Sequence, residues 1–215
     1  MKKVILFQGD SITDCSRNRD LDFNRGYGYA TMVTGVLTAR EPYTYTCYNR
    51  GISGERVVDV YARIRKDMIN LKPDYISILV GVNGIWHECS EHNGVSNEKY
   101  ETVYDLMLTE IKQELPNVKL MLLEPFVLHG TATEDVPECP NRWAYYQQEI
   151  VLRQQTVARL AKKHGAVFVP LQEMFTKLEA EAPAEGYWLR DGVHPTAAGH
   201  ERIKQEWLKA FEKMK

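Results

Sequence analysis

The run of residues 75–80, Tyr-Ile-Ser-Ile-Leu-Val, is short and almost continuously apolar. Helices cover both faces of a strand in a parallel sheet, so the sequence of such a strand is apolar throughout rather than alternating. Similar short β-rich runs occur at residues 3–8, 43–48, 119–123 and 166–169. Between them, apolar residues recur three and four positions apart, as in amphipathic helices. This alternation predicts an α/β fold with three layers, a five-stranded parallel sheet between two layers of helices.

The same spacing predicts where the longest helices lie. They are expected over residues 57–68, 103–115, about 142–163 and about 195–214. The third of them ends in three basic residues followed by Gly165, a combination that favours a helix C-terminus. Residues 129–141 have no such periodicity and contain one glycine and two prolines, which predicts an irregular loop that serves as a lid, a subunit contact or a surface excursion.

Length and charge exclude several classes of protein. The 215 residues fit one domain spanning residues 1–215, and 27 basic against 29 acidic residues give a net charge of −2. We find no basic stripe that would bind nucleic acid or an anionic membrane, and no apolar stretch near the roughly 20 residues of a membrane span. The N-terminal apolar run is too short for a signal peptide, and the four cysteines form no C-x-x-C pair. We therefore expect a cytoplasmic protein with reduced thiols.

Polar and glycine-rich segments follow the predicted strands at the points where these end. Ser11 comes after the first strand, residues 49–54 after the second, residues 81–84 after the third, and Asp191 and His194 after the fifth and a further helix. In parallel sheets, ligands bind beyond the carboxyl ends of the strands. We expect these four segments to meet at one edge of the sheet.

Ser11, Asp191 and His194 are the side chains that a nucleophilic hydrolase needs. Because Asp191 and His194 are three residues apart, a single turn can place the carboxylate against the imidazole. The carboxylate would then fix the tautomer of the ring, and the other ring nitrogen would take the hydroxyl proton of Ser11. The sequence predicts Ser11 as the nucleophile, His194 as the general base and then acid, and Asp191 as the residue that orients it.

Three hydrogen-bond donors are expected around the carbonyl oxygen of the substrate. They are the backbone N–H of Ser11, the backbone N–H of Gly51, which no side chain obstructs, and the side-chain amide of Asn83. Donors that converge on one point stabilise the negative charge that develops on this oxygen, so the three would form an oxyanion hole.

Four blocks of the sequence resemble the SGNH hydrolase family, also called GDSL esterases and lipases: Gly-Asp-Ser-Ile-Thr-Asp at residues 9–14, Gly51, Asn83, and Asp191-x-x-His194-Pro195. The resemblance covers nearly the whole chain in the right order. It implies a flavodoxin-like sheet of five strands and serine-ester chemistry. Residues 49–54, residues 81–86 and the ending His194-Pro195-x-x-x-Gly199-His200 look most like bacterial carbohydrate acetylesterases of the acetylxylan-esterase kind.

One position departs from this pattern. The third block of the family usually reads Gly-x-Asn-Asp, whereas Gly84 stands here in place of the aspartate. That carboxylate would accept hydrogen bonds and brace the loop that carries Asn83. With Gly84 we expect a looser loop, an Asn83 that is held less firmly, and an esterase whose activity is impaired or altered.

A substrate pocket is predicted from residues near these blocks: Asp10, Trp86, Tyr187 and Trp188. The three aromatic side chains would form a wall for a sugar ring, although aromatic residues pack cores more often than they bind ligands. Asp10 also suits a bracing role beside the nucleophile.

Residues 87–92, His-Glu-Cys-Ser-Glu-His, suggest a zinc site at first sight. Their two histidines are five residues apart, which is roughly 140° around a helix, so they would not face one metal ion. We expect a polar loop here instead, and neither a metal nor a cofactor in the protein.

The sequence thus predicts a serine ester hydrolase that removes short acyl groups, most simply acetyl, from carbohydrate esters such as acetylated oligosaccharides. A lysophospholipase or thioesterase of the same family is an alternative, which would need an apolar groove. A non-catalytic, flavodoxin-like binding module is another; Gly84 favours it, whereas an intact Ser11–Asp191–His194 set weighs against it. The aromatic residues and residues 129–141 are compatible with a homo-oligomer.

Overall fold

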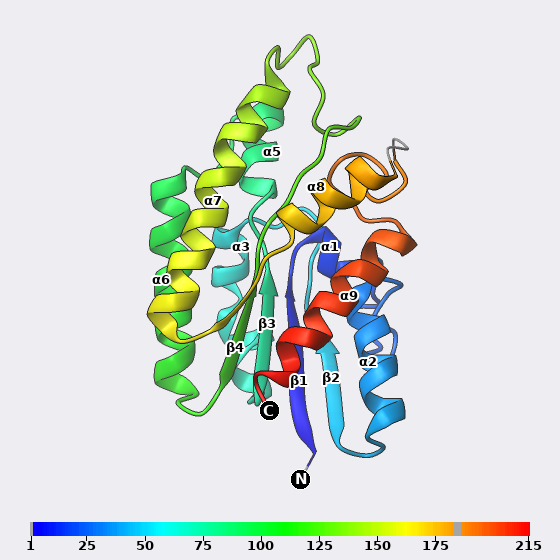
Figure 1. Cartoon of the computed structure of the whole chain (residues 1–215). Coiled ribbons are helices and arrows are strands. Elements are labelled where there is room, and N and C mark those ends of the chain that lie inside the picture. Colours follow the sequence, from blue (N-terminus) through cyan, green and yellow to red (C-terminus); the bar gives the residue numbers. More distant parts are fainter. Residues whose placement is uncertain (1, 183–185) are drawn as a thin grey trace.

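The structure of the protein is a computed structural model that describes residues 2–182 and 186–215. At its centre lies a five-stranded sheet with the order β2-β1-β3-β4-β5, in which all neighbouring strands are parallel (Figure 1). The strands are β1 (Lys3–Gly9), β2 (Tyr45–Asn49), β3 (Tyr75–Leu79), β4 (Lys119–Leu123) and β5 (Val167–Val169). Each strand begins and ends within two residues of the predicted run, so the α/β class and the parallel sheet are confirmed.

Helices follow every strand. They are α1 (Ser11–Asp14), α2 (Tyr29–Arg40), α3 (Val57–Ala62), α4 (Ile64–Asp67), the 3₁₀ helix η1 (Ile69–Leu71), α5 (Asn83–Glu91), α6 (Asn97–Glu114), α7 (Arg142–His164), α8 (Gln172–Glu181) and α9 (Ala197–Glu212). Three of the four predicted helices are present as α6, α7 and α9. The helix expected over residues 57–68 is broken at Arg63, whose φ of −113° and ψ of 16° depart from helical values.

The prediction of a polar loop at residues 87–92 is wrong, because helix α5 continues to Glu91. The helix buries Gly84 and Ile85 and exposes Glu88 and Ser90, so it is amphipathic. No side chain caps its first turn, and it begins soon after β3 ends. A sequence without a capping residue gives no signal for the start of such a helix.

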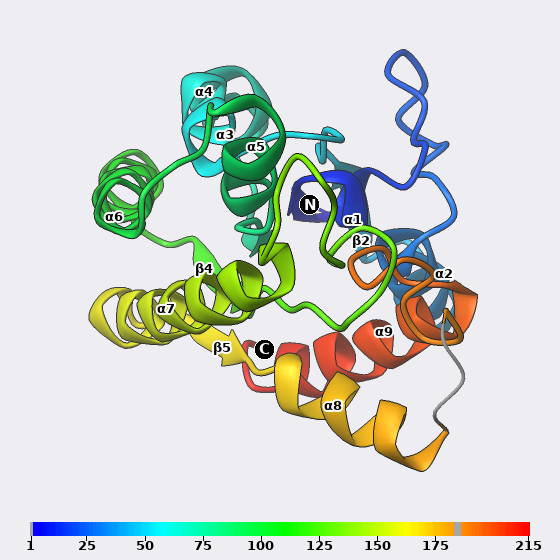
Figure 2. The ribbon, with the colours of Figure 1, turned by 90° about the horizontal axis from the view of Figure 1, so that it is seen from above.

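Helices cover both faces of the sheet (Figure 2). Two apolar cores lie between the sheet and these helices. On one face, Phe7 of β1 packs against Trp207 of α9 with ring centroids 5.3 Å apart, and residues of α2, α5, α7 and α8 belong to the same core. On the other face, Leu6 packs with residues of α3, α4 and α6. Because successive strand residues point to opposite faces, β1 is buried on both sides. The position of its carboxyl end is therefore fixed by packing from two directions.

Strand β1 has β2 on one flank and β3 on the other, so the strand order reverses beside it. In open parallel sheets, ligands bind at such a reversal, beyond the carboxyl ends of the strands. Ser11 lies two residues beyond the end of β1. Within the residues that the structure describes, no helix combines the length and the apolar character that a membrane span requires.

Candidate active site

Ser11 opens the short helix α1 and is presented by a tight connection from β1. Gly9 has a φ of +156°, and a Cβ atom there would lie 2.1 Å from the carbonyl oxygen of Leu79, so only glycine allows β1 and β3 to end this close together. Asp10 caps the helix, since its Oδ1 accepts the backbone N–H of Ile12 at 3.1 Å. Asp10 is fully buried, and burial raises its pKa to about 7. It braces the turn rather than facing a substrate.

Asp191 organises the turn that carries His194. Its Oδ1 accepts the backbone N–H groups of Val193 at 3.0 Å and His194 at 2.8 Å, and its Oδ2 accepts the His194 Nδ1–H at 2.8 Å. Burial opposes the charge of this carboxylate, but these hydrogen bonds outweigh it and hold the pKa of Asp191 well below its usual range. Asp191 is therefore a permanent anion against the imidazole.

The structure brings Ser11 and His194 together across 183 positions of the sequence: the Ser11 hydroxyl lies 2.9 Å from Nε2 of His194. Since Nδ1 faces the Asp191 carboxylate, the proton of the neutral ring is on Nδ1, and Nε2 accepts the Ser11 O–H. The side chain of His194 is 32% exposed, so the ring can be reached from solvent. This geometry is that of a nucleophile, a base and an orienting carboxylate.

The irregular residues after β4 hold the Asp191–His194 turn in place. The N–H of Leu128 donates to the carbonyl of Gly192 at 2.8 Å, and the N–H of Ala132 donates to the carbonyl of Asp191 at 2.9 Å. Gly130 packs so closely that a Cβ atom there would lie 2.5 Å from the carbonyl carbon of Asp191. Part of the loop predicted at residues 129–141 is thus a support for the turn, a role that its composition alone does not indicate.

Two of the three predicted oxyanion-hole donors are available. The backbone N–H of Ser11 donates to no described residue. The Asn83 amide donates one hydrogen to the carbonyl of Glu55 at 3.0 Å, which fixes its position and leaves its second hydrogen for a ligand.

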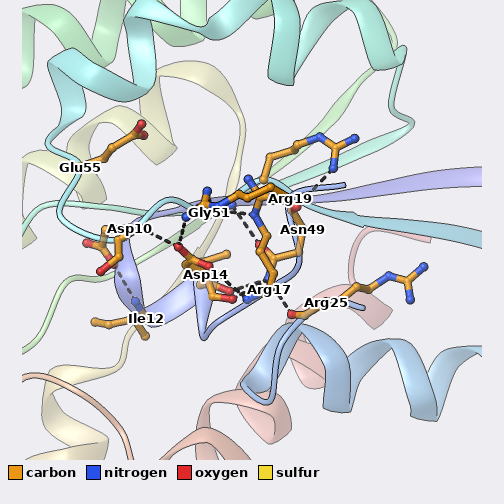
Figure 3. Close-up of polar contacts among 12 residues, drawn as sticks. Asp10, Ile12, Asp14, Arg17, Arg19, Arg25, Asn49, Gly51 and Glu55 are labelled. Atoms are coloured by element: carbon orange, nitrogen blue, oxygen red, sulfur yellow. Dashed lines mark hydrogen bonds and ion pairs between the residues drawn. The ribbon is translucent and has the colours of Figure 1, made fainter. Parts of the chain in front are cut away.

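The third predicted donor, Gly51, needs a correction. Its N–H already donates to Oδ1 of Asn49 at 2.9 Å, and its carbonyl accepts from Nε of Arg17 at 2.7 Å (Figure 3). A Cβ atom at Gly51 would lie 2.5 Å from the backbone nitrogen of Asp14. Glycine is therefore needed here so that α1 can pack against the chain beyond β2, and the N–H is not free for a substrate.

Gly54, the second glycine of the same block, has the free backbone N–H that the sequence led us to expect of Gly51. Its backbone N–H donates to none of the described residues, and its φ is +83°. Its carbonyl accepts from Nε2 of His87, and the next residue, Glu55, holds the Asn83 amide. The two glycines in residues 49–54 are both candidate oxyanion-hole donors by sequence. Sequence alone does not show which of their N–H groups already donates a hydrogen bond within the protein.

A cavity of about 390 Å³ opens beside Ser11 and His194. Its lining is mostly polar: Ser11, Ile12, Asp14, Cys15, Ser16, Arg17, Arg19, Tyr27, Ser53, Arg190, His194, Pro195, Thr196, Ala197 and His200. It is the most direct place for a substrate to reach the nucleophile, because the Ser11–His194 pair forms part of its wall.

The four residues predicted to form a substrate pocket do not line this cavity. Asp10 is buried beneath the turn, and Trp86 packs its ring on the guanidinium of Arg142, 4.6 Å from the ring centroid. The indole N–H of Trp188 donates to the carbonyl of Leu178 at 3.0 Å, so this side chain anchors α8. Tyr187 is half exposed and packs edge-on against Trp188. The predicted aromatic wall is replaced by a polar, arginine-containing cavity.

Comparison with known proteins agrees with this geometry. The sequence matches the GDSL-like Lipase/Acylhydrolase family over residues 7–202. The chain belongs to this family. It is therefore a GDSL-type esterase, a carboxylic ester hydrolase, with the fold and the serine block that the sequence resemblance implied.

Two relatives of this GDSL esterase cover nearly its full length. An acetylxylan esterase of Geobacillus stearothermophilus is 32% identical over 216 residues, which cover 95% of this chain and 92% of that protein. The crystal structure of a putative GDSL-like lipase from Parabacteroides merdae has a TM-score of 0.87 at 34% identity and covers 98% of this chain and 96% of its own.

A catalytic mutant of the Geobacillus acetylxylan esterase, with alanine in place of a serine, superposes with a TM-score of 0.83 at 27% identity. The match covers 98% of this chain and 95% of the mutant. A second catalytic mutant of the same enzyme has alanine in place of a histidine. The relative thus uses the same two residue types that Ser11 and His194 provide here.

Gly84 does not form a loose loop in this GDSL esterase. It lies in the first turns of α5, is buried, and accepts the N–H of Val95 on its carbonyl at 3.1 Å. The guanidinium of Arg153, which is 1% exposed, lies against it and donates from Nη2 to the carbonyl of Val95 at 2.6 Å. The helix and this arginine hold the segment that the family's aspartate was expected to brace.

Cys15 lines the cavity of the esterase but is not a second nucleophile. Nδ1 of His200 accepts the N–H of Tyr29 at 3.2 Å, so the proton of the neutral ring is on Nε2 and is donated to Sγ of Cys15 at 3.0 Å. Burial raises the pKa of Cys15 to about 11 and lowers that of His200 to about 4. The pair is neutral, and it ties α9 to α1.

Proposed function

We propose that this esterase removes acetyl and similarly short acyl groups from carbohydrate esters, with Ser11 as the nucleophile. The observation that carries the proposal is the hydrogen-bonded chain from Ser11 through His194 to Asp191, with links of 2.9 and 2.8 Å. Such a chain activates a serine hydroxyl for attack on an ester carbonyl.

Each step has its group in this site. His194 takes the hydroxyl proton as Ser11 attacks the carbonyl, and the oxyanion is held by the N–H of Ser11, the N–H of Gly54 and the amide of Asn83. His194 then gives the proton to the departing alcohol, which leaves an acyl-Ser11 ester. A water molecule, deprotonated by His194, attacks that ester, and the imidazolium returns the proton to Oγ of Ser11 as the acid is released. Asp191 stabilises the imidazolium in both halves of the reaction.

The choice of substrate rests on the cavity and on the relatives. The cavity beside Ser11 is lined mainly by hydroxyl, carboxylate, guanidinium and imidazole groups, which suit a hydroxyl-rich sugar better than a fatty acyl chain. One relative is an acetylxylan esterase, and a similar structure is that of an acetyl-xylooligosaccharide esterase mutant. Both observations support an acetylated carbohydrate, whereas a lysophospholipase would need an apolar groove beside the nucleophile.

The test compares hydrolysis of p-nitrophenyl acetate, butyrate and octanoate by the wild type, Ser11→Ala and Ser53→Ala. Ser53 lines the same cavity and serves as the matched serine control. We expect acetate to be turned over much faster than octanoate, Ser11→Ala to lower kcat by at least about a thousandfold, and Ser53→Ala to leave turnover measurable. Faster turnover of octanoate would move the assignment to a lipid substrate. A folded wild type that hydrolyses none of the three would favour the binding module.

A further inference from the structure

The cavity beside Ser11 contains more positive than negative side chains. Arg17, Arg19 and Arg190 line it, and Asp14 is the one acidic side chain among the described lining residues. The imidazole of His200 adds no charge at neutral pH, because burial lowers its pKa to about 4. An acetyl group is far smaller than the cavity, so most of the space serves the alcohol part of the ester.

The acidic groups around the cavity already have partners. Asp14 accepts from Nη2 of Arg19 at 2.6 Å and from the N–H of Ser53 at 2.8 Å, and Asp191 is bonded to His194. Two further pairs lie nearby, Asp22 with Arg50 and Glu55 with Arg63. Arg190 approaches Asp191 only to 3.5 Å and is 62% exposed. The positive charge of Arg17 is therefore not matched by a carboxylate of its own.

Arg17 is also held in a defined position. It is 9% exposed, and its Nε donates to the carbonyl of Gly51 at 2.7 Å (Figure 3). Its terminal Nη1 and Nη2 groups donate to none of the described residues. Burial, and next the charge of Arg19, lower the pKa of Arg17, as expected where positive groups gather. A planar guanidinium fixed at one nitrogen and free at the other two is suited to bind a carboxylate through two parallel hydrogen bonds.

We propose that Arg17, assisted by Arg190, binds a carboxylate on the alcohol part of the ester, so that the enzyme prefers acylated acidic sugars over neutral ones. This inference rests on the proposed esterase function and adds the charge of the substrate to it. The two arginines lie on different segments of the cavity wall, one after α1 and one in the turn before Asp191. A carboxylate near Arg17 would place the rest of the alcohol within the cavity that contains Ser11 and His194.

The test uses two esters of similar shape, 4-acetoxybenzoate, which is an anion at neutral pH, and 4-acetoxybenzamide, which is neutral. The readout is the ratio of their kcat/KM values within each variant, since a general effect on the chemistry cancels in this ratio. We expect the wild type to favour the anion, and Arg17→Gln to lower the ratio about tenfold, mainly through KM of the anion. The preference should also weaken as salt is added.

Arg159→Gln is the control for net charge, because Arg159 is an exposed arginine of α7 that does not line the cavity. It should leave the ratio unchanged. If Arg17→Gln fails to fold, Arg190→Gln provides a second variant at an exposed side chain, with a smaller fall expected. A wild-type ratio near one that neither variant alters would overturn the proposal while leaving the esterase function intact.

A binding measurement on Ser11→Ala separates the two proposals completely. Calorimetry with the products 4-hydroxybenzoate and 4-hydroxybenzamide needs no turnover. Tighter binding of the anion, lost on adding Arg17→Gln, supports the carboxylate site even if the protein hydrolyses no test ester. Equal binding of the two products would reject it even in an active esterase.

Discussion

Arg153 of α7 lies directly against Gly84 of α5, so that a Cβ atom at Gly84 would be 3.1 Å from Nη1 of the arginine. The guanidinium is almost completely buried, and its Nε and Nη1 have no hydrogen-bond partner among the described residues. Burial lowers the pKa of Arg153, which shows that its charge is costly where it lies. Its one acidic neighbour among the described residues is Glu149, whose carboxylate lies 3.8 Å from Nη2. The aspartate usual in this family at position 84 would give the guanidinium a second, closer carboxylate.

Gly84→Asp is therefore expected to stabilise the fold. A small shift of Arg153 would let the new carboxylate accept from Nε or Nη1, and a charge-assisted hydrogen bond is worth about 1.5–3 kcal/mol. The measurement is the free energy of unfolding in urea. Gly84→Ala is the control, because alanine also removes the helical cost of glycine, about 1 kcal/mol, but brings no charge. Equal stabilisation by alanine and aspartate would mean that no ion pair forms with Arg153.

Asp191→Asn tests the orientation of His194. The asparagine can no longer accept on both oxygens, so it loses either the backbone N–H groups or the Nδ1–H of His194, and the ring loses both its tautomer and its counter-charge. We expect kcat for p-nitrophenyl acetate to fall by roughly 10³–10⁴. Near-ultraviolet circular dichroism would check that the fold is retained. A loss of less than tenfold would contradict the assigned role.

The buried carboxyl of Asp10 should make stability depend on pH. Burial raises its folded pKa to about 7 from an ordinary value of 3.8, so the folded state prefers the protonated form. The stabilisation is present below about pH 4 and is lost as pH rises toward 7, because only the unfolded chain ionises freely in this window. Asp10→Asn should lack this loss, and its stability relative to the wild type should rise between pH 4 and 7 in urea unfolding. A difference that does not change with pH would show that Asp10 ionises normally.

The two glycines of residues 49–54 should respond differently to alanine. Gly51→Ala places a Cβ 2.5 Å from the Asp14 backbone, so it should destabilise the fold by about 1–3 kcal/mol. Gly54→Ala has open space but a φ of +83°, and the strain of roughly 1–2 kcal/mol should turn its N–H away and lower kcat more than stability. Thermal unfolding and kcat, measured for both variants, show which of the two glycines is the oxyanion-hole donor. A kcat loss in Gly51→Ala without loss of stability would restore Gly51 as the donor.

The sheet could be predicted from the sequence because each strand is a short apolar run between glycines or polar residues, a local property. Ser11, Asp191 and His194 could be placed together because parallel strands deliver their loops to one edge. Helix α5 could not be predicted, since it has no capping residue and its exposed face is polar.

The remaining errors concern neighbours that are distant in the sequence. Whether Gly51 or Gly54 has a free N–H depends on the side chain of Asn49 and on how closely α1 approaches. Trp188 lies near His194 in the sequence, yet its indole N–H points to α8. Arg17, Arg19 and Arg190 gather around one cavity only because the fold brings the segment after α1 next to the turn before Asp191, and no local sequence pattern predicts this contact.

Ser11 and His194 are 183 positions apart in the sequence, and this separation has a consequence for synthesis on the ribosome. Ser11 and its turn emerge early, but the hydroxyl stays unactivated until the Asp191 turn has been made and has docked on the loop after β4. A nascent or truncated chain therefore displays the serine block without the ability to cleave esters. If Ser11 and His194 act as proposed, esterase activity reports a chain that has been synthesised at least through His194 and folded, whereas the presence of the serine block does not.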